Sequence, residues 1–335
     1  GSIGGVNVAD NASLNLSNLK NVQINGPVTV EDGGVLSAVD VGAMSMGVVN
    51  ANGTVDLTVS ELDVTGGGKT SGDLNLNGFI VGGTATLNVA GDINVLKVGA
   101  DSVTGTIQNN SEATIVAAGN INVAGNLENS GTSMTIKNAA LTVDGTMKND
   151  AGKLSLLDLQ SWTVSGMDAG GYSFVNSADF AAVVNGAVSL ANGWNLAGMS
   201  ASNSFSLTTQ SIDLGNNKAI LNHINDFELN VTAGDLVVST VTNETSNAQM
   251  KLDVSGTFSA NYLADAGALM NVKATDIVLL GQSLDNVQTS LYVSSDASNA
   301  SLTASGSLTA GALVSNIGNL TLRAPQISLV DISNS

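Results

Sequence analysis

The sequence predicts an all-β protein that folds as a right-handed parallel β-helix (β-solenoid) with coils of roughly 20–25 residues. Three observations lead to this prediction. The composition favours short strands and tight turns, proline is nearly absent, and one apolar pattern recurs along the chain. We expect residues 1–335 to form a single solenoid, with a less regular insertion or wider coils around residues 157–220.

The composition suits strands rather than helices. Hydrophobic residues make up 43% of the 335 residues, whereas aromatic residues make up only 3% and charged residues 11%. β-Branched and aliphatic residues alternate with Asn, Ser, Thr, Asp and the 38 glycines. β-Branched residues favour strands, and Gly, Asn and Asp tolerate the positive φ of tight turns. The positive mean hydropathy, +0.24, argues against disorder.

Proline would interrupt the pairing of strands, because it has no backbone N–H to donate. The chain contains only Pro27 and Pro325. Strands can therefore pair along nearly the whole sequence.

Internal repetition distinguishes a solenoid from other all-β folds. Ile121-Asn-Val-Ala-Gly-Asn-Leu127 recurs twenty residues later as Leu141-Thr-Val-Asp-Gly-Thr-Met147, which aligns Asn129 with Asn149. Further copies lie at Trp162–Met167 and, in shorter form, at Val103–Ile107. Alternate residues of a strand point to opposite faces, so the apolar residues share a core and the polar ones face solvent. One coil buries its inward face only against neighbouring coils.

A longer period is predicted for the C-terminal third. Apolar pairs start 25 residues apart, and we expect them to occupy equivalent places in successive coils: Leu252, Ile277, Leu302 and Ile327. Between them lie strings in which Asn or His precedes an apolar residue, such as Asn286-Val287, Asn316-Ile317 and His223-Ile224. A β-sandwich does not predict such a translation, and a propeller blade needs about 40 residues.

The charge balance excludes some partners. The chain has 10 basic and 28 acidic residues, a net charge of -18, and Arg323 is its only arginine. Nucleic-acid binding requires Lys and Arg to neutralise phosphates, so we expect no nucleic-acid partner. No apolar stretch reaches the 18 residues that a transmembrane helix needs, and we expect no such segment.

The aromatic residues gather where the repeat is least regular. They are Trp162, Tyr172, Phe174, Phe180 and Trp194. The favoured interpretation is that they fill the core of an insertion or of wider coils, and the alternative is a ligand groove. A helical turn is predicted at residues 179–184.

We expect no enzymatic activity and no catalytic residues. Pectinolytic enzymes also use parallel β-helices, but the Asn-Thr-Asp, Asp-Asp, Gly-His-Gly and Arg-Ile-Lys strings of polygalacturonase-like enzymes are absent. His223 is the only histidine and would be a base beside Asp226. His223 stands where Asn stands in the other recurring strings, which favours a structural role in a turn over a role as a base. The Gly66–Thr70 string lacks the spacing of a phosphate-binding loop.

Metal sites receive little support from the residue types. With one His and no Cys, we expect no zinc site. Calcium is the one cofactor that the acids leave open, although turn formation is the favoured role of Asp92, Asp144, Asp253 and Asp276. Asn-x-Ser/Thr sequons are expected by chance in so Asn-rich a chain, and they include Asn11, Asn52, Asn230, Asn243 and Asn299.

One segment resembles a known kind of repeat. Gly119-Asn-Ile-Asn-Val-Ala-Gly-Asn-Leu-Glu-Asn-Ser-Gly131 is similar to the passenger repeats of bacterial autotransporters and of filamentous-haemagglutinin-type adhesins, and Asn316-Ile-Gly-Asn-Leu-Thr-Leu322 is similar in style. The resemblance is one of repeat type, and no individual motif can be aligned. It implies a secreted bacterial β-helix exposed at the cell surface. The sequence departs from those families in two respects, since we recognise in it neither a C-terminal membrane barrel nor an opening secretion domain.

Two structural functions follow as expectations. In the first, the chain self-associates end to end into an extracellular fibre, sheath or matrix, because neither terminus shows a helical cap and uncapped strand edges permit head-to-tail stacking. In the second, it is a monomeric adhesin passenger that binds a cell-surface, matrix or carbohydrate ligand. A polysaccharide-degrading β-helix enzyme is a remote third.

Overall fold

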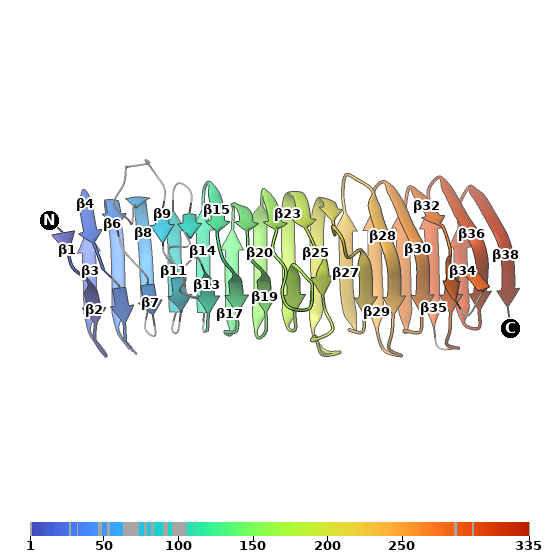
Figure 1. Cartoon of the computed structure of the whole chain (residues 1–335), viewed down its shortest axis with the longest axis horizontal. Coiled ribbons are helices and arrows are strands. Elements are labelled where there is room, and N and C mark those ends of the chain that lie inside the picture. Colours follow the sequence, from blue (N-terminus) through green and yellow to red (C-terminus); the bar gives the residue numbers. More distant parts are fainter. Residues whose placement is uncertain are drawn as a thin grey trace. The chain divides into compact units, whose positions relative to one another are not determined.

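The computed structural model is a parallel β-solenoid, as the sequence predicts: the strands stack in coils, and no helix occurs in the described part of the chain (Figure 1). The described residues are 2–26, 28–31, 33–45, 49–51, 54–62, 74–76, 79–81, 84–89, 93–95, 106–110, 112–284, 287–296 and 298–334. The contacts divide the chain into two units, Gly1–Phe174 and Val175–Ser335, each described below by itself. Strand β22 (Phe174–Asn176) begins at the last residue of unit 1.

Unit 1 has three columns of parallel strands. The first contains β3 (Ser13–Ser17), β6 (Val35–Ser45), β8 (Thr54–Leu62), β11 (Thr84–Val89), β14 (Glu112–Ala117), β17 (Ser133–Lys137) and β20 (Lys153–Leu159). The second contains β1 (Ser2–Ile3), β4 (Asn21–Ile24), the ends of β6 and β8, β9 (Leu74–Leu76), β12 (Ile93–Val95), β15 (Asn120–Val123), β18 (Ala140–Val143) and β21 (Ser161–Val164). The third contains β2 (Val6–Val8), β5 (Val28–Val30), β7 (Val49–Ala51), β10 (Phe79–Val81), β13 (Ile107–Asn109), β16 (Leu127–Asn129) and β19 (Met147–Asn149).

Unit 2 repeats this arrangement with longer strands. Its first column contains β23 (Asp179–Leu190), β25 (Ser204–Asp213), β27 (Asp226–Val231), β29 (Gln249–Val254), β31 (Leu269–Ala274), β35 (Asn299–Ala304) and β37 (Asn319–Arg323). The remaining faces contain β24 (Trp194–Asn195), β26 (Ala219–Asn222), β28 (Leu236–Asn243), β30 (Thr257–Asp265), β32 (Asp276–Leu279), β33 (Gln282–Leu284), β34 (Val287–Val293), β36 (Ser307–Asn316) and β38 (Gln326–Asn334). Strand β33 pairs antiparallel with β34, as a hairpin inserted into one coil.

The twenty-residue repeat of unit 1 is confirmed in register. Leu127 pairs with Met147, and Asn129 pairs with Asn149. Trp162 lies on the coil above Leu141, as the alignment of the third copy predicts. The inward side chains of these strands are buried, which gives the solenoid its core. Of the shorter copy at residues 103–107, only the end is described; there Ile107 pairs with Leu127.

The 25-residue register predicted for the C-terminal third is wrong. Leu252 and Leu302 do share a column, because both pair with Val272. Ile277 and Ile327 lie instead on a different face, where both pair with Leu308. The two coils between Leu252 and Leu302 have unequal lengths, since the β33–β34 hairpin lengthens one of them. The regular spacing is therefore an average of unequal coils.

The helical turn predicted at residues 179–184 is also wrong. These residues begin strand β23, and their burial alternates along the chain. Phe180, Ala182 and Val184 point into the core of unit 2, whereas the residues between them are more exposed. A period of two residues is that of a strand, so the inward aromatic and aliphatic groups override the helical propensity of the two alanines.

The aromatic residues of the irregular region contribute to the core of their own units. In unit 1, buried Trp162 packs edge to face on buried Phe174, with ring centroids 5.2 Å apart. In unit 2, Phe180 and Trp194 are buried as well. Their burial supports the core-filling interpretation over a ligand groove. Tyr172 is half-buried.

The recurring glycine of the repeat has a steric cause. The N–H of Gly145 donates to the carbonyl of Gly125 one coil below (2.9 Å), and the N–H of Gly166 donates to the carbonyl of Gly145 (3.1 Å). A Cβ atom at Gly145 would lie 2.4 Å from the Gly125 oxygen, closer than any van der Waals contact allows. The turns of successive coils can therefore approach only if this position lacks a side chain.

Replacing Gly145 with alanine is expected to lower the free energy of unfolding by about 1–3 kcal/mol, because the backbones of adjacent turns must separate. Urea unfolding followed by circular dichroism measures this loss. Asp144→Ala, at the exposed neighbouring position, is the control and is expected to have little effect. Equal stability of Gly145→Ala and the parent chain would contradict the proposed contact.

Candidate functional site

The last coil of unit 2 exposes side chains that other coils bury. In strand β38, Ile327 follows the column of Leu308 and Ile332 follows the column of Val314. Leu308 and Val314 are each 1% exposed, whereas Ile327 is 45% exposed and Ile332 is 56% exposed. Among the described residues β38 pairs with β36 alone, so one edge of its backbone and its inward apolar positions are uncovered there.

Strands β37 and β3 share one alternating pattern. Strand β37 is Asn319-Leu-Thr-Leu-Arg323 and β3 is Ser13-Leu-Asn-Leu-Ser17, and in both the leucines are half-buried between exposed residues. Leu36, which pairs with Leu14 inside unit 1, is fully buried. Each unit therefore has one five-residue strand whose Leu-x-Leu pair is covered on one side only.

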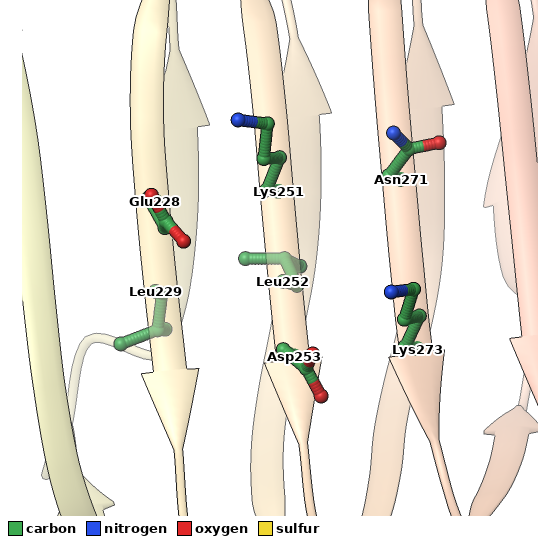
Figure 2. A pocket seen from close by; sticks show the side chains of 7 residues that line it. All are labelled: Glu228, Leu229, Lys251, Leu252, Asp253, Asn271 and Lys273. Carbon is green, nitrogen blue, oxygen red and sulfur yellow. The ribbon is translucent and has the colours of Figure 1, made fainter.

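A shallow depression of about 150 Å³ lies on the outward face of unit 2, across β27, β29 and β31 (Figure 2). It is lined by Glu228, Leu229, Lys251, Leu252, Asp253, Asn271 and Lys273. The register brings these residues together from three coils, since Glu228 pairs with Lys251 and Asp253 pairs with Lys273. In Figure 2 both lysine side chains lean toward the coil that precedes them.

The charges of this depression are balanced. Each lysine adjoins an acid of the preceding coil, Lys251 beside Glu228 and Lys273 beside Asp253. All four side chains are exposed, so such pairs contribute at most about 1 kcal/mol each. The depression has no net charge from these four residues and is therefore a weak candidate for binding either an anion or a cation.

His223 occupies a turn, as the Asn/His string predicts. Its Nε2 lies 2.8 Å from the carbonyl oxygen of Met199, one coil below, so this nitrogen carries the proton and donates it. The hydroxyl of Thr245 donates to the His223 carbonyl at 3.2 Å. These bonds join successive turns of unit 2. Asp226 follows as the exposed first residue of β27.

The aspartates considered for calcium are dispersed, and of those described only Asp144 lies in a turn. The turn role expected for Asp253 and Asp276 is wrong, because Asp253 lies within β29 and Asp276 begins β32. Asp144 and Asp253 are exposed, and Asp92 lies outside the described residues, as does the Gly66–Thr70 string. Asp276 binds the next coil: its Oδ1 accepts hydrogen bonds from the N–H (2.6 Å) and hydroxyl (2.7 Å) of Ser307. The Ser307 hydroxyl and N–H lower the pKa of Asp276. No cluster of three potential metal ligands occurs among the residues that the structure describes.

Sequence reasoning missed that this capping arrangement recurs. Oδ1 of Asp235 accepts a hydrogen bond from the N–H of Thr257 (2.7 Å), and Oδ1 of Asn126 accepts one from the N–H of Thr146 (3.0 Å). In each case the side chain precedes or begins a strand and binds the coil that follows. The recurrence of Asp or Asn beside the repeat's glycine was the available signal.

The sequons differ in accessibility. Asn243 is fully buried in unit 2, so its amide is inaccessible to modification in the folded chain. Asn11 and Asn299 are exposed, Asn230 is half-buried, and Asn52 lies outside the described residues.

Comparison with known proteins gives no relative. No family model, curated protein or solved structure matches the chain. In the part of the chain that the structure describes, no helix has the length and apolar character needed to span a bilayer. The function is therefore inferred from the residues of this chain.

Proposed function

We propose that this chain is a secreted, non-enzymatic bacterial surface protein whose β-solenoid assembles head to tail with further copies into an extracellular fibre, sheath or matrix. The observation that carries the proposal is the exposure of inward apolar positions on the last coil, above all Ile332, which is 56% exposed where its column neighbour Val314 is 1% exposed.

The proposed partner is a second copy of this chain, for a geometric reason. Strand β37 and strand β3 have equal length and the same Leu-x-Leu alternation. Pairing them in parallel would continue the ladder found within each unit and would cover Leu320 with Leu14 and Leu322 with Leu16. Because this contact uses two different surfaces, each copy leaves both surfaces open for the next, and the contact propagates.

The charge of the chain is compatible with axial growth. A net charge of -18 opposes lateral clumping of strand-rich surfaces, whereas the apolar side chains that β37 and β38 leave uncovered are uncharged: Leu320, Leu322, Ile327 and Ile332. The repeat-type resemblance to autotransporter passengers and filamentous-haemagglutinin-type adhesins supports a place outside the cell. It also supports the second candidate, an adhesin passenger, for which the depression across β27, β29 and β31 is the candidate ligand surface.

The test is negative-stain electron microscopy and size-exclusion chromatography of the 335-residue chain across a concentration series. We expect filaments that lengthen with concentration. Ile332→Lys should abolish them, because stacking would bury the new ammonium group at a cost of several kcal/mol. Ile332 is exposed in the single chain, so the substitution should leave the fold intact.

Ser333→Lys is the matched control. Ser333 is exposed on the same strand and follows the outward column of Ser315, so its lysine would remain in solvent after stacking. Filaments in this variant but not in Ile332→Lys would support the proposal. A monomer at every concentration would overturn it in favour of the adhesin passenger, and filaments that persist in Ile332→Lys would exclude this coil as the interface.

A further inference from the structure

A column of buried amide side chains in unit 2 ends on an acid. Asn222, Asn243 and Asp265 occupy equivalent positions of β26, β28 and β30. Nδ2 of Asn222 donates to Oδ1 of Asn243 (2.8 Å), and Nδ2 of Asn243 donates to Oδ1 of Asp265 (2.9 Å). On the next coil the equivalent residue is Val293 of β34, which is buried and apolar. The amide column therefore stops at Asp265.

The two carboxyl oxygens of Asp265 have different surroundings. Oδ1 accepts hydrogen bonds from Nδ2 of Asn243 and from the N–H of Gly267 (3.0 Å). Oδ2 is buried and has no hydrogen-bond partner among the described residues. The whole residue is 0% exposed. An ionised carboxylate with one unsatisfied oxygen is costly in such a place.

Asn243 shows what this position requires. Its Oδ1 accepts from the coil below, and its Nδ2 donates to three oxygens: the Ala248 carbonyl (3.1 Å), Oδ1 of Asp265 (2.9 Å) and the Leu269 carbonyl (3.0 Å). In Asp265, Oδ1 is again the acceptor, so Oδ2 takes the place of the donating nitrogen. A carboxylic acid with its proton on Oδ2 is uncharged there, whereas a carboxylate leaves negative charge on an oxygen that no donor contacts.

Burial raises the pKa of Asp265 above its ordinary 3.8, and the hydrogen bonds from Asn243 and Gly267 oppose this rise only in part. The residues that pair with Asp265 on the neighbouring strands are Asn243 on β28 and Val293 on β34. Neither has a titratable side chain.

The titratable groups of the surrounding elements are few. Tyr262 lies on the same strand as Asp265, and Tyr292 lies on β34. Burial raises the pKa of Tyr262 above its ordinary 10.0, with a smaller contribution from Tyr292. The turn after β34, whose Ser294 and Ser298 hydroxyls donate to the Asp265 carbonyl, also carries the exposed Asp296.

We infer that Asp265 is held as a neutral carboxylic acid in the folded chain, and that loss of its proton loosens β30 against β34, so that this coil boundary is a pH-sensitive joint. The proton leaves Oδ2 for solvent, and the remaining carboxylate faces Val293 without a donor for that oxygen. The inference does not depend on the proposed assembly.

The direction of the pH effect follows from proton linkage. Because the folded-state pKa is raised, the folded chain binds more protons than the unfolded chain in the interval above 3.8. The contribution of Asp265 is thus fully present below 3.8 and is lost as pH rises through the folded pKa. Asp276, whose pKa is lowered, acts in the opposite sense and loses its contribution as pH falls.

The test compares Asp265→Asn with the parent chain in thermal unfolding from about pH 4 to about pH 8. Asparagine has the shape of aspartate and carries no charge at any pH of the test, so it mimics the neutral acid. We expect the variant to raise the unfolding temperature by roughly 3–6 °C at the upper pH and by much less at the lower pH. Asp253→Asn, an exposed site on β29, is the matched control and should follow the parent profile.

A spectroscopic measurement separates ionisation from packing. Infrared difference spectra of the parent chain against Asp265→Asn should contain the C=O stretch of a protonated carboxylic acid, which disappears as pH rises. Absence of this band at the lowest pH would overturn the inference. So would equal pH profiles of the two chains, or an Asp265→Asn variant that is less stable at the upper pH.

Discussion

Replacing Phe205 with alanine is expected to lower the free energy of unfolding of unit 2 by about 3–5 kcal/mol, the range for large aromatic side chains removed from a core. Phe205 is buried at the centre of a stack that follows the register Phe180, Phe205, Phe227. Its ring centroid lies 5.0 Å from that of Phe180 and 4.9 Å from that of Phe227. Trp194 packs edge to face against it at 5.3 Å.

This loss combines two effects. Alanine leaves a cavity that the rigid coils on either side cannot close, and it removes aromatic contacts worth about 0.5–1.5 kcal/mol each beyond their buried area. Urea unfolding monitored by tryptophan fluorescence is the measurement. Ser206→Ala, at the half-buried outward neighbour, should change stability by less than about 0.5 kcal/mol. A loss below 1.5 kcal/mol for Phe205→Ala would show that the stack is not a principal source of stability.

Replacing Asn129 with leucine is expected to cost about 3–5 kcal/mol in unit 1, although leucine has a similar volume and is more hydrophobic. Nδ2 of Asn129 donates to Oδ1 of Asn149 (2.7 Å) and to the Ala151 carbonyl (3.0 Å), and its Oδ1 accepts from Nδ2 of Asn109 (2.7 Å). All three asparagines are 0% exposed. Leucine would remove these bonds while the groups they satisfy stay buried.

The matched control for Asn129→Leu is Glu128→Gln on the outward face of the same strand, which is expected to be nearly neutral. Hydrogen exchange of the amides in β13, β16 and β19 localises the effect: protection should fall there first, because each coil contacts only its neighbours. A leucine variant as stable as the parent chain would show that apolar packing compensates for the lost column.

The sequence predicted the solenoid, and it predicted the register over residues 107–164 because the coils there have nearly constant length. The preceding coils of unit 1 are longer, as in the pairing of Val49 with Phe79, and no repeat was recognised in them. The alignment of Asn129 with Asn149 is the clearest case. The sequence pattern predicted that these two residues are neighbours, but it did not predict that their side chains are buried in the core. In unit 2 the same reasoning misassigned Ile277 and Ile327 because the β33–β34 hairpin changes one coil length. A prediction that assumes one constant coil length cannot detect an insertion in a single coil.

The candidate site was less predictable than the fold. Glu228, Lys251 and Asn271 are neighbours only because three coils share a register, and their sequence separations are unequal. The same holds for Asp265: nothing near it in sequence indicates that a column of asparagines ends on it. Its position follows from pairing with Asn243, which the structure provides.

The asparagine columns also give each unit an electrical direction. In these two buried columns the amide bonds run toward the coil of higher number, from Asn109 to Asn129 to Asn149 in unit 1 and from Asn222 to Asn243 in unit 2. Outward asparagines such as Asn122, which donates to Asn94, bond in the opposite sense. Within each buried column the side-chain dipoles therefore add along the stack, as peptide dipoles add along a helix, and each bond polarises the next. The partially positive end of the second series points at the carboxyl group of Asp265. If a single amide were reversed, two like dipole ends would face each other. All amides of one column must therefore share the same orientation.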